Sequence, residues 1–260
     1  MPLVEELGID LGTVNVLVYV RGKGIVLQEP SVVAQELESG EVVAVGEEAR
    51  AMMGRAPETI VVRRPLRAGV IADYRVTREM LFYFINRTIG KMRLLKPRVC
   101  VTVPFGATQV ERRAVRDAAL EAGAGKVLRI PEPLAGAIGA GLPIHTPGGH
   151  MIVDLGGGTS QAAVLSVYGV VTSSAIREGG VRMDEAIAAY VRRKYNLMLG
   201  QPSAEEAKIR IGSALPLDEP MRTEVQGRDQ VSGLPRSVEI TSDDIVEALE
   251  EPISLITNMV

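Results

Sequence analysis

Two stretches of the chain decide the fold because they repeat one pattern. The first is GIDLGTVNVLVYVRGKGIV, residues 8–26, and the second is IVDLGGGTSQAAVLSVYGVV, residues 152–171. In each stretch a β-branched apolar run ends at Asp-Leu-Gly, and a second apolar run and a glycine turn follow. The pattern predicts three strands joined by two tight turns. Because this unit occurs twice, we expect two similar half-domains.

Strands and helices are expected to alternate between the two stretches. Residues 98–103 and 126–130 are short apolar runs typical of buried strands. Thr108 and Glu111 have the spacing of a capping box and predict a helix that begins there. The small residues of 132–140 predict another helix, one that can pack close to a neighbour. The order of elements therefore indicates an α/β fold.

The predicted division of the chain follows the repeat. We expect a first half over residues 1–145 and a second half over residues 146–260. Strand-rich segments with many glycines and prolines predict a small subdomain in each half, at about 30–65 and about 180–240.

The C-terminal segment predicts a helix that starts at a capping signal formed by Thr241 and Asp244. Its apolar stripe has helical spacing and consists of Ile245, Leu249, Ile253 and Ile256. Pro252 costs about 3 kcal/mol inside a helix unless it marks a kink. Because the stripe still runs at Val260, we expect the second half to be incomplete.

Composition excludes several functional classes. The chain has 260 residues and a net charge of -3, which gives no overall electrostatic reason to bind nucleic acid. One cysteine, Cys100, excludes an internal disulfide, and two histidines without cysteine partners argue against a zinc site. A basic leader before an apolar core is not found, and neither is a run of 18 apolar residues. We therefore expect a cytoplasmic protein.

The two Asp-Leu-Gly turns point to a phosphate ligand. Asp10 and Asp154 each end an apolar strand, where a carboxylate is costly unless a cation or a hydrogen bond compensates it. Mg²⁺ prefers one or two carboxylates together with water and phosphate oxygens. The glycines and hydroxyls of 12–15 and 156–159 offer donors to phosphates. The pattern predicts a nucleoside triphosphate in a cleft between the halves, although ordinary hairpin turns would also favour Asp and Gly.

Further segments carry a resemblance to a known family. They are residues 8–15, 22–26, 29–33, 69–74, 110–113 and 183–187. In this order they resemble the MreB family of bacterial actin homologues, within the superfamily of actin, sugar kinases and heat-shock chaperone ATPases. The resemblance spans nearly the whole chain. It implies an actin-like ATPase fold with two ribonuclease-H-like halves, and an ATP-binding, slowly hydrolysing subunit of filaments that direct rod shape and cell-wall synthesis.

The resemblance also implies roles for individual residues. Asp10 and Asp154 would hold Mg²⁺ through water, and Glu132 with Thr159 would orient the water that attacks the γ-phosphate. The residues expected to bind ATP are Gly12, Thr13, Val14, Asn15, Gly156, Gly157, Gly158, Thr159, Glu205 and Lys208. Spacing alone allows plainer interpretations, since Glu205 and Lys208 could form an exposed helical ion pair and Glu132 could simply start a helix.

The resemblance implies a membrane contact and partners as well. Leu94 and Leu95 lie among basic residues in a loop that, in related proteins, is thought to enter the bilayer. Two leucines bury little apolar area, so one copy would bind weakly and a filament of many copies firmly. The expected partners are other copies of the chain, the inner face of the cytoplasmic membrane and membrane proteins of cell-wall elongation. The expected location is peripheral, at that membrane face.

Some positions depart from the family pattern. Gln161 stands where the family usually has an acidic residue, Pro131 where one is frequent, and Val181 where Asp is common. Family members also continue past the position of Val260. The departures at Gln161 and Val181 keep open a nucleotide switch or adaptor that does not polymerise. A small-molecule kinase on the same scaffold is a separate alternative. Asp73 is the weak candidate for the base that a kinase would need.

Overall fold

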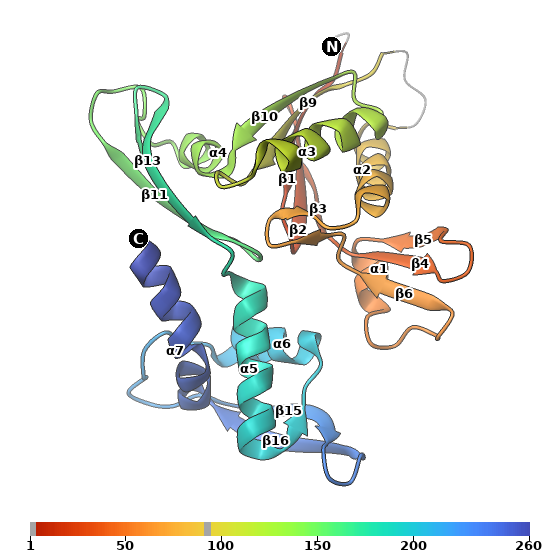
Figure 1. Ribbon diagram of the computed structural model, residues 1–260, viewed down its shortest axis with the longest axis vertical. Helices are drawn as coiled ribbons and strands as arrows, with labels where there is room; N and C mark the ends of the chain where they lie inside the picture. Colours follow the sequence, from red (N-terminus) through yellow and green to blue (C-terminus); the bar gives the residue numbers. More distant parts are fainter. Residues whose placement is uncertain (1–3, 91–94) are drawn as a thin grey trace. The chain divides into compact units, whose positions relative to one another are not determined.

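The computed structural model describes residues 4–90 and 95–260 (Figure 1). The chain forms two compact units, residues 1–177 and 178–260. The boundary between these units, after residue 177, is defined by packing. The boundary predicted near residue 145 is defined by the sequence repeat, so the two divide the chain by different criteria. The predicted halves and their subdomain limits stay a prediction.

The first unit is built on a five-stranded sheet. Its order is β10 (Lys126–Pro131), β9 (Arg98–Val103), β1 (Glu6–Leu11), β2 (Asn15–Val20) and β3 (Gly24–Pro30). Strands β10, β9 and β1 are parallel, and β1, β2 and β3 form an antiparallel meander. Apolar side chains of this sheet form one core with helices α2 (Tyr74–Ile89) and α3 (Gln109–Glu121).

Helix α3 starts as its sequence predicts. The Thr108 backbone N–H donates to the Glu111 carboxylate at 2.7 Å, and the Glu111 N–H donates to the Thr108 hydroxyl at 3.3 Å. The capping box therefore satisfies two donors that a helix start leaves open. The predicted strands at β9 and β10 and the predicted helix α4 (Glu132–Gly139) are also confirmed.

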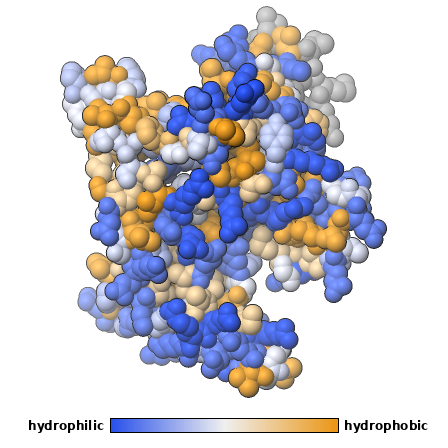
Figure 2. Space-filling view, viewed as in Figure 1, coloured by the Kyte–Doolittle hydropathy of each residue, from blue (hydrophilic) through white to orange (hydrophobic). Residues whose placement is uncertain are grey.

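The second Asp-Leu-Gly stretch forms its own antiparallel meander in the same unit. It consists of β11 (His150–Leu155), β12 (Ser160–Ser166) and β13 (Gly169–Ile176), and its inner side chains pack against α4. Apolar residues also reach the surface over this sheet (Figure 2), among them Met151 and Leu155, which are 49% and 61% exposed. The predicted repeat of strand, turn, strand, turn, strand is confirmed.

The two meanders share a turn as well as a strand order. In the first, the Gly12 N–H donates to the Asn15 carbonyl at 3.1 Å; in the second, the Gly156 N–H donates to the Thr159 carbonyl at 2.8 Å. The same hydrogen bond thus closes both turns, so the repeat extends to the backbone geometry.

A small sheet follows the first meander. It contains β4 (Val33–Glu36), β5 (Val42–Val45) and β6 (Ile60–Arg63) and packs on the short helix α1 (Glu47–Ala51). A two-residue hairpin, β7 (Leu66–Arg67) and β8 (Val70–Ile71), follows it.

The second unit combines three helices with a three-stranded sheet. The helices are α5 (Gly180–Tyr195), α6 (Gln201–Ile211) and α7 (Ser242–Met259), and the strands are β14 (Leu197–Met198), β15 (Arg222–Asp229) and β16 (Pro235–Thr241). The predicted capping signal of Thr241 and Asp244 is confirmed at the start of α7. Helix α7 runs through Pro252, which is buried in it, and does not end there.

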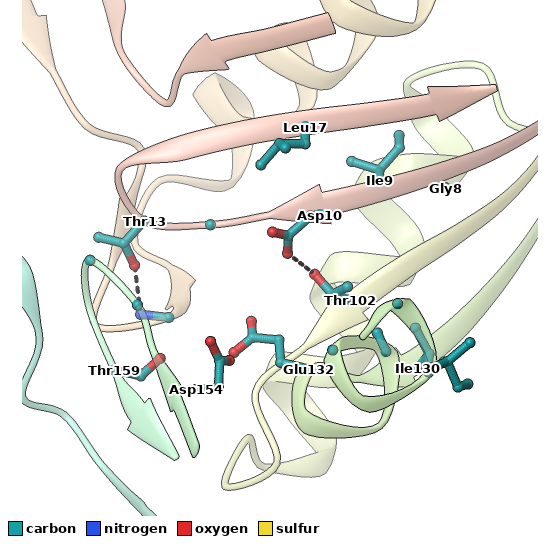
Figure 3. A pocket seen from close by; sticks show the side chains of 18 of the residues that line it. Gly8, Ile9, Asp10, Thr13, Leu17, Thr102, Ile130, Glu132, Asp154 and Thr159 are labelled. Carbon is teal, nitrogen blue, oxygen red and sulfur yellow. Dashed lines mark hydrogen bonds between the residues drawn. The ribbon is translucent and has the colours of Figure 1, made fainter. Parts of the chain in front are cut away.

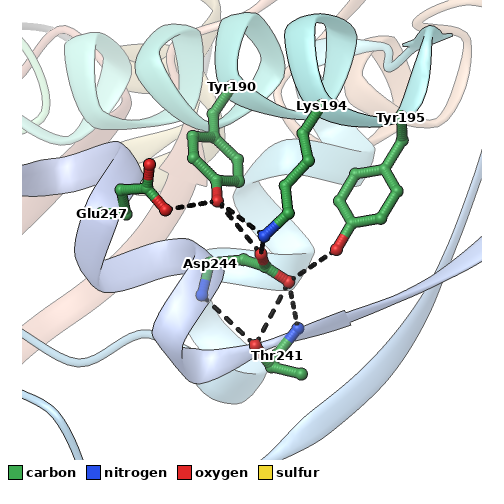
Figure 4. Close-up of polar contacts among 6 residues, drawn as sticks. All are labelled: Tyr190, Lys194, Tyr195, Thr241, Asp244 and Glu247. Atoms are coloured by element: carbon green, nitrogen blue, oxygen red, sulfur yellow. Dashed lines mark hydrogen bonds and ion pairs between the residues drawn. The ribbon is translucent and has the colours of Figure 1, made fainter.

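A buried carboxylate ties α5 to α7 in this unit (Figure 4). Asp244 accepts hydrogen bonds from the Lys194 ammonium at 2.6 Å, the Tyr195 hydroxyl at 2.9 Å and the Thr241 N–H at 2.8 Å. Burial alone would raise the pKa of Asp244, but the Lys194 ammonium, the Thr241 N–H and the Tyr195 hydroxyl outweigh it and lower that pKa to about 2. The cluster holds the two helices together through an ionised side chain.

Candidate functional site

The first acidic turn places Asp10 on the face of β1 opposite to the core. Ile9 and Leu11 are buried under the helices, and the alternation of a strand turns Asp10 the other way. The Thr102 hydroxyl on the neighbouring strand β9 donates to the Asp10 carboxylate at 2.7 Å and accepts the Leu11 N–H at 3.1 Å. Asp10 is therefore held in one orientation.

The second acidic turn places Asp154 in the equivalent position on β11. Its cross-strand partner on β12 is Gln161, whose amide nitrogen lies 3.5 Å from the Asp154 carboxylate. Burial, and to a lesser degree the negative charge of Asp10, raise the pKa of Asp154. Asp10 is therefore close enough to affect the ionisation of Asp154.

A third carboxylate, Glu132, enters from the first residue of α4. It accepts a hydrogen bond from the Gln161 amide. Burial raises the pKa of Glu132 to about 7, the Gln161 hydrogen bond opposes this rise, and the charges of Asp154 and Asp10 add to it. In Figure 3 the carboxyl groups of Asp10, Glu132 and Asp154 face the same space.

That space is a cavity of about 880 Å³ within the first unit. Glu132 and predicted site residues from both turns line its polar wall. The residues from the turns are Asp10, Gly12, Thr13, Asp154, Gly156, Gly157, Gly158 and Thr159. The remaining wall is apolar and includes Leu17, Ile130 and Ile152. Both aspartates thus line one hollow, as a shared ligand requires.

The two turns touch each other at their glycines. A Cβ on Gly157 would lie 2.2 Å from Cγ2 of Val14, and a Cβ on Gly158 would lie 2.3 Å from the Thr13 hydroxyl oxygen. The Gly69 N–H donates to that same hydroxyl at 2.9 Å. Only glycine lets the second turn approach the first this closely.

The donor set fits a hydrated Mg²⁺ ion better than a fully protein-bound metal. Among the residues that the structure describes, no group of three or more His, Cys, Asp or Glu side chains could enclose a metal ion. Two carboxylates on separate glycine-containing turns of one cavity match an ion that keeps several waters and binds phosphate oxygens. The predicted roles of Asp10 and Asp154 toward Mg²⁺ stay a prediction.

Other predicted site residues lie elsewhere. Val14 and Asn15 belong to the first turn but are not among the described residues that line the cavity. Glu205 and Lys208 lie on α6 in the second unit, where the Lys208 ammonium contacts the Asp184 carboxylate at 2.6 Å and the Gly180 carbonyl at 2.8 Å. Their contact with a nucleoside stays a prediction.

The loop that is predicted to contact a membrane is described only in part. Leu95 is 49% exposed, and Leu94 lies outside the described residues. In residues 4–90 and 95–260, the helices are all too short or too polar to cross a bilayer. Asp73, the candidate base of a kinase, instead caps α2 by accepting the Val76 N–H at 3.1 Å.

Three residues that shape the site were not predicted from the sequence. Thr102 orients Asp10, and the Gly69 backbone binds Thr13. The Ser31 hydroxyl donates to the Gly12 carbonyl at 2.6 Å and holds the first turn from behind. Ser31 lies in the segment 29–33 and Gly69 opens the segment 69–74, both of which carry the family resemblance, but nothing in either segment indicated a contact with the turn.

The duplicated meander and the shared cavity define an actin-like α/β protein. The structure of MreB5 of Spiroplasma citri bound to AMPPNP superposes with a TM-score of 0.91 and 37% sequence identity, covering 98% of this chain and 77% of that one. The MamK double helical filament gives a TM-score of 0.80 at 22% identity, over 98% of this chain and 78% of that chain, and so supports the fold alone.

Comparison with known sequences shows to which family of actin-like proteins the chain belongs. The family model described as MreB/Mbl protein matches residues 4–260. The cell shape-determining protein MreB of Escherichia coli is 51% identical over 98% of this chain and 75% of its own length. The cell shape-determining protein Mbl of Bacillus cereus is 48% identical over 97% of this chain and 76% of its own length. The chain belongs to the MreB/Mbl family.

Proposed function

We propose that the protein is an ATP-binding, slowly hydrolysing, actin-like cytoskeletal subunit that forms membrane-associated filaments and determines cell shape. The observation that carries the proposal is the cavity that is lined by Asp10 and Asp154, from the two turns, and by Glu132. The names of the relatives as cell shape-determining proteins, and the MreB5 structures with AMPPNP and ADP, support it.

Each part of the cavity has a task in this proposal. The backbone of Gly12, Thr13 and residues 156–159 binds the phosphates. Asp10 and Asp154 would hold Mg²⁺ through water, and the bound ion would supply charge neutralisation at the phosphates. Glu132 orients the attacking water, and the Thr159 hydroxyl helps to position it. Phosphoryl transfer depends mainly on positioning and electrostatics, so few side chains suffice for a slow rate.

The polymer is tested by light scattering and sedimentation of the purified protein with ATP and Mg²⁺. We expect filaments, and we expect Glu132→Ala to retain ATP binding while it releases phosphate at least tenfold more slowly, because water-orienting groups contribute about 10²–10⁴-fold. A protein that stays monomeric at high concentration, on lipid and off it, contradicts the cytoskeletal proposal. Filaments with normal phosphate release from Glu132→Ala would reassign the catalytic role.

The membrane contact needs its own test. We expect the double change Leu94→Ser and Leu95→Ser to abolish pelleting with liposomes and to leave nucleotide binding intact. Leu37→Ser is a suitable control, because Leu37 is also exposed, at 60%, but lies outside the loop. Pelleting that survives the double change removes the loop from the proposal.

A further inference from the structure

Gln161 is a fully buried polar side chain that contacts two acids of the cavity. It lies on β12 opposite Asp154 of β11, with none of its surface exposed. A buried amide needs partners for both its oxygen and its nitrogen. Each of its two ends contacts a different part of the site.

The oxygen end is fixed by the backbone. The Phe105 N–H donates to Gln161 Oε1 at 2.7 Å. Because a backbone N–H can only donate, it fixes the oxygen at that end and leaves the nitrogen at the other. The orientation of the amide is therefore set from outside the cavity.

The nitrogen end faces two acids. Gln161 Nε2 donates to the Glu132 carboxylate and lies 3.5 Å from the Asp154 carboxylate. An amide at this position supplies hydrogen-bond donors to two negative groups. A carboxylate there could still accept from Phe105 but would offer Glu132 no proton and add a third negative charge.

We propose that Gln161 is a positioning residue that fixes the Glu132 carboxylate in the pose that orients the attacking water. This inference rests on the proposed ATP hydrolysis and deepens it. It gives a positive role to a residue whose type departs from the acidic one usual in the family. Gln161 acts through Glu132 and has no direct contact with the nucleotide in this account.

Two substitutions remove the donor in different ways. Gln161→Glu keeps an acceptor for the Phe105 N–H and is nearly the same size, whereas Gln161→Met keeps the length and removes both hydrogen bonds. Gln35→Glu is the matched control: Gln35 is also buried, 3% exposed, but its amide contacts Gly40 and Arg63 in the small sheet region.

The experiment measures single-turnover ATP hydrolysis by the full chain at saturating ATP and Mg²⁺, with nucleotide affinity and thermal unfolding measured in parallel. We expect both Gln161 variants to hydrolyse ATP at least tenfold more slowly, with nucleotide Kd within about threefold of wild type, because a positioning defect lowers the rate and not the ground-state affinity. Gln35→Glu should hydrolyse ATP at the wild-type rate.

A double-mutant cycle with Glu132→Ala separates positioning from a merely structural role. If Gln161 acts through Glu132, Gln161→Glu has no further effect on the rate in the Glu132→Ala background. The inference is overturned if the wild type hydrolyses ATP and the Gln161→Glu variant hydrolyses it at the same rate. It is also overturned if the losses of rate in the cycle are additive. In either case the proposed function still stands. No hydrolysis by the wild type overturns both. If Gln161→Met does not fold, Gln161→Glu, which keeps the Phe105 hydrogen bond, decides the test.

Discussion

Gly157→Ala is the substitution that tests most directly whether the two turns form one site. The new Cβ would lie 2.2 Å from Cγ2 and 2.8 Å from Cβ of Val14, closer than carbon atoms approach. Because Val14 belongs to the other turn, the clash can be relieved only by moving the turns apart or by displacing that side chain. Overpacking of this kind costs about 1–3 kcal/mol.

The expected result is a lower stability of the first unit together with weaker nucleotide binding. Each kcal/mol lowers the melting temperature of a unit this size by about 2–4 °C, so we expect a loss of about 2–12 °C. Separation of the turns should also weaken ATP binding, by about tenfold for each 1.4 kcal/mol lost from the phosphate contacts. Thermal unfolding and equilibrium nucleotide titration measure the two effects.

Two variants make the test of Gly157→Ala specific. Gly139→Ala is the control, because Gly139 also lines the cavity but a Cβ there meets nothing within 4 Å. It should be neutral. Val14→Gly removes the clashing atoms, so the loss caused by Gly157→Ala should shrink in the double variant. A Gly157→Ala protein with wild-type stability and affinity would refute the close contact of the turns.

Three further predictions follow from single hydrogen-bonded groups. Thr102→Val removes the donor that orients Asp10, and we expect the Mg²⁺ concentration needed for ATP binding to rise about 10–100-fold, as for other groups that orient a metal ligand. Thr108→Ala should lower the free energy of unfolding by about 0.5–2 kcal/mol in urea, through loss of the α3 cap. The pKa of Asp244 falls from 3.8 to about 2 on folding, so its ionisation adds about 2 kcal/mol of stability above pH 4, and this is lost as the pH falls from 4 to 2. Urea unfolding of Asp244→Asn should therefore depend less on pH over that interval than wild type does.

Local features of the fold were predictable because their causes are local. The capping box of Thr108 and Glu111 lies within one turn of α3, and each Asp-Leu-Gly turn is closed by a hydrogen bond between residues three apart. Such patterns can be recognised in a sequence because the residues that form the hydrogen bonds are close neighbours in the chain. The repeat then extended the prediction from one meander to the other.

The contacts that orient the acids were not predictable, because they join distant parts of the chain. Thr102 binds Asp10 across 92 positions, and Gln161 binds Glu132 across 29. The contacts of Gln161 could not be predicted from its neighbours in the sequence. Its residue type suggested a lost negative charge, and only the arrangement of Phe105 and Glu132 around it shows an amide donor.

The acids of the cavity also link ligand binding to stability. Folding raises the pKa of Glu132 from 4.5 to about 7, with burial as the main cause and Asp154 and Asp10 as further causes. A carboxyl group with a raised pKa destabilises the folded state as the pH rises from about 4.5 to about 7, at a cost on the order of 3 kcal/mol. In the proposed function, a cation held by Asp10 and Asp154 would neutralise the charges that contribute to this rise, and a ligand that binds only the folded state adds its binding free energy to stability. We therefore predict that a Mg²⁺-nucleotide stabilises the first unit by more than it would stabilise a unit whose cavity has the same shape but lacks the three carboxylates.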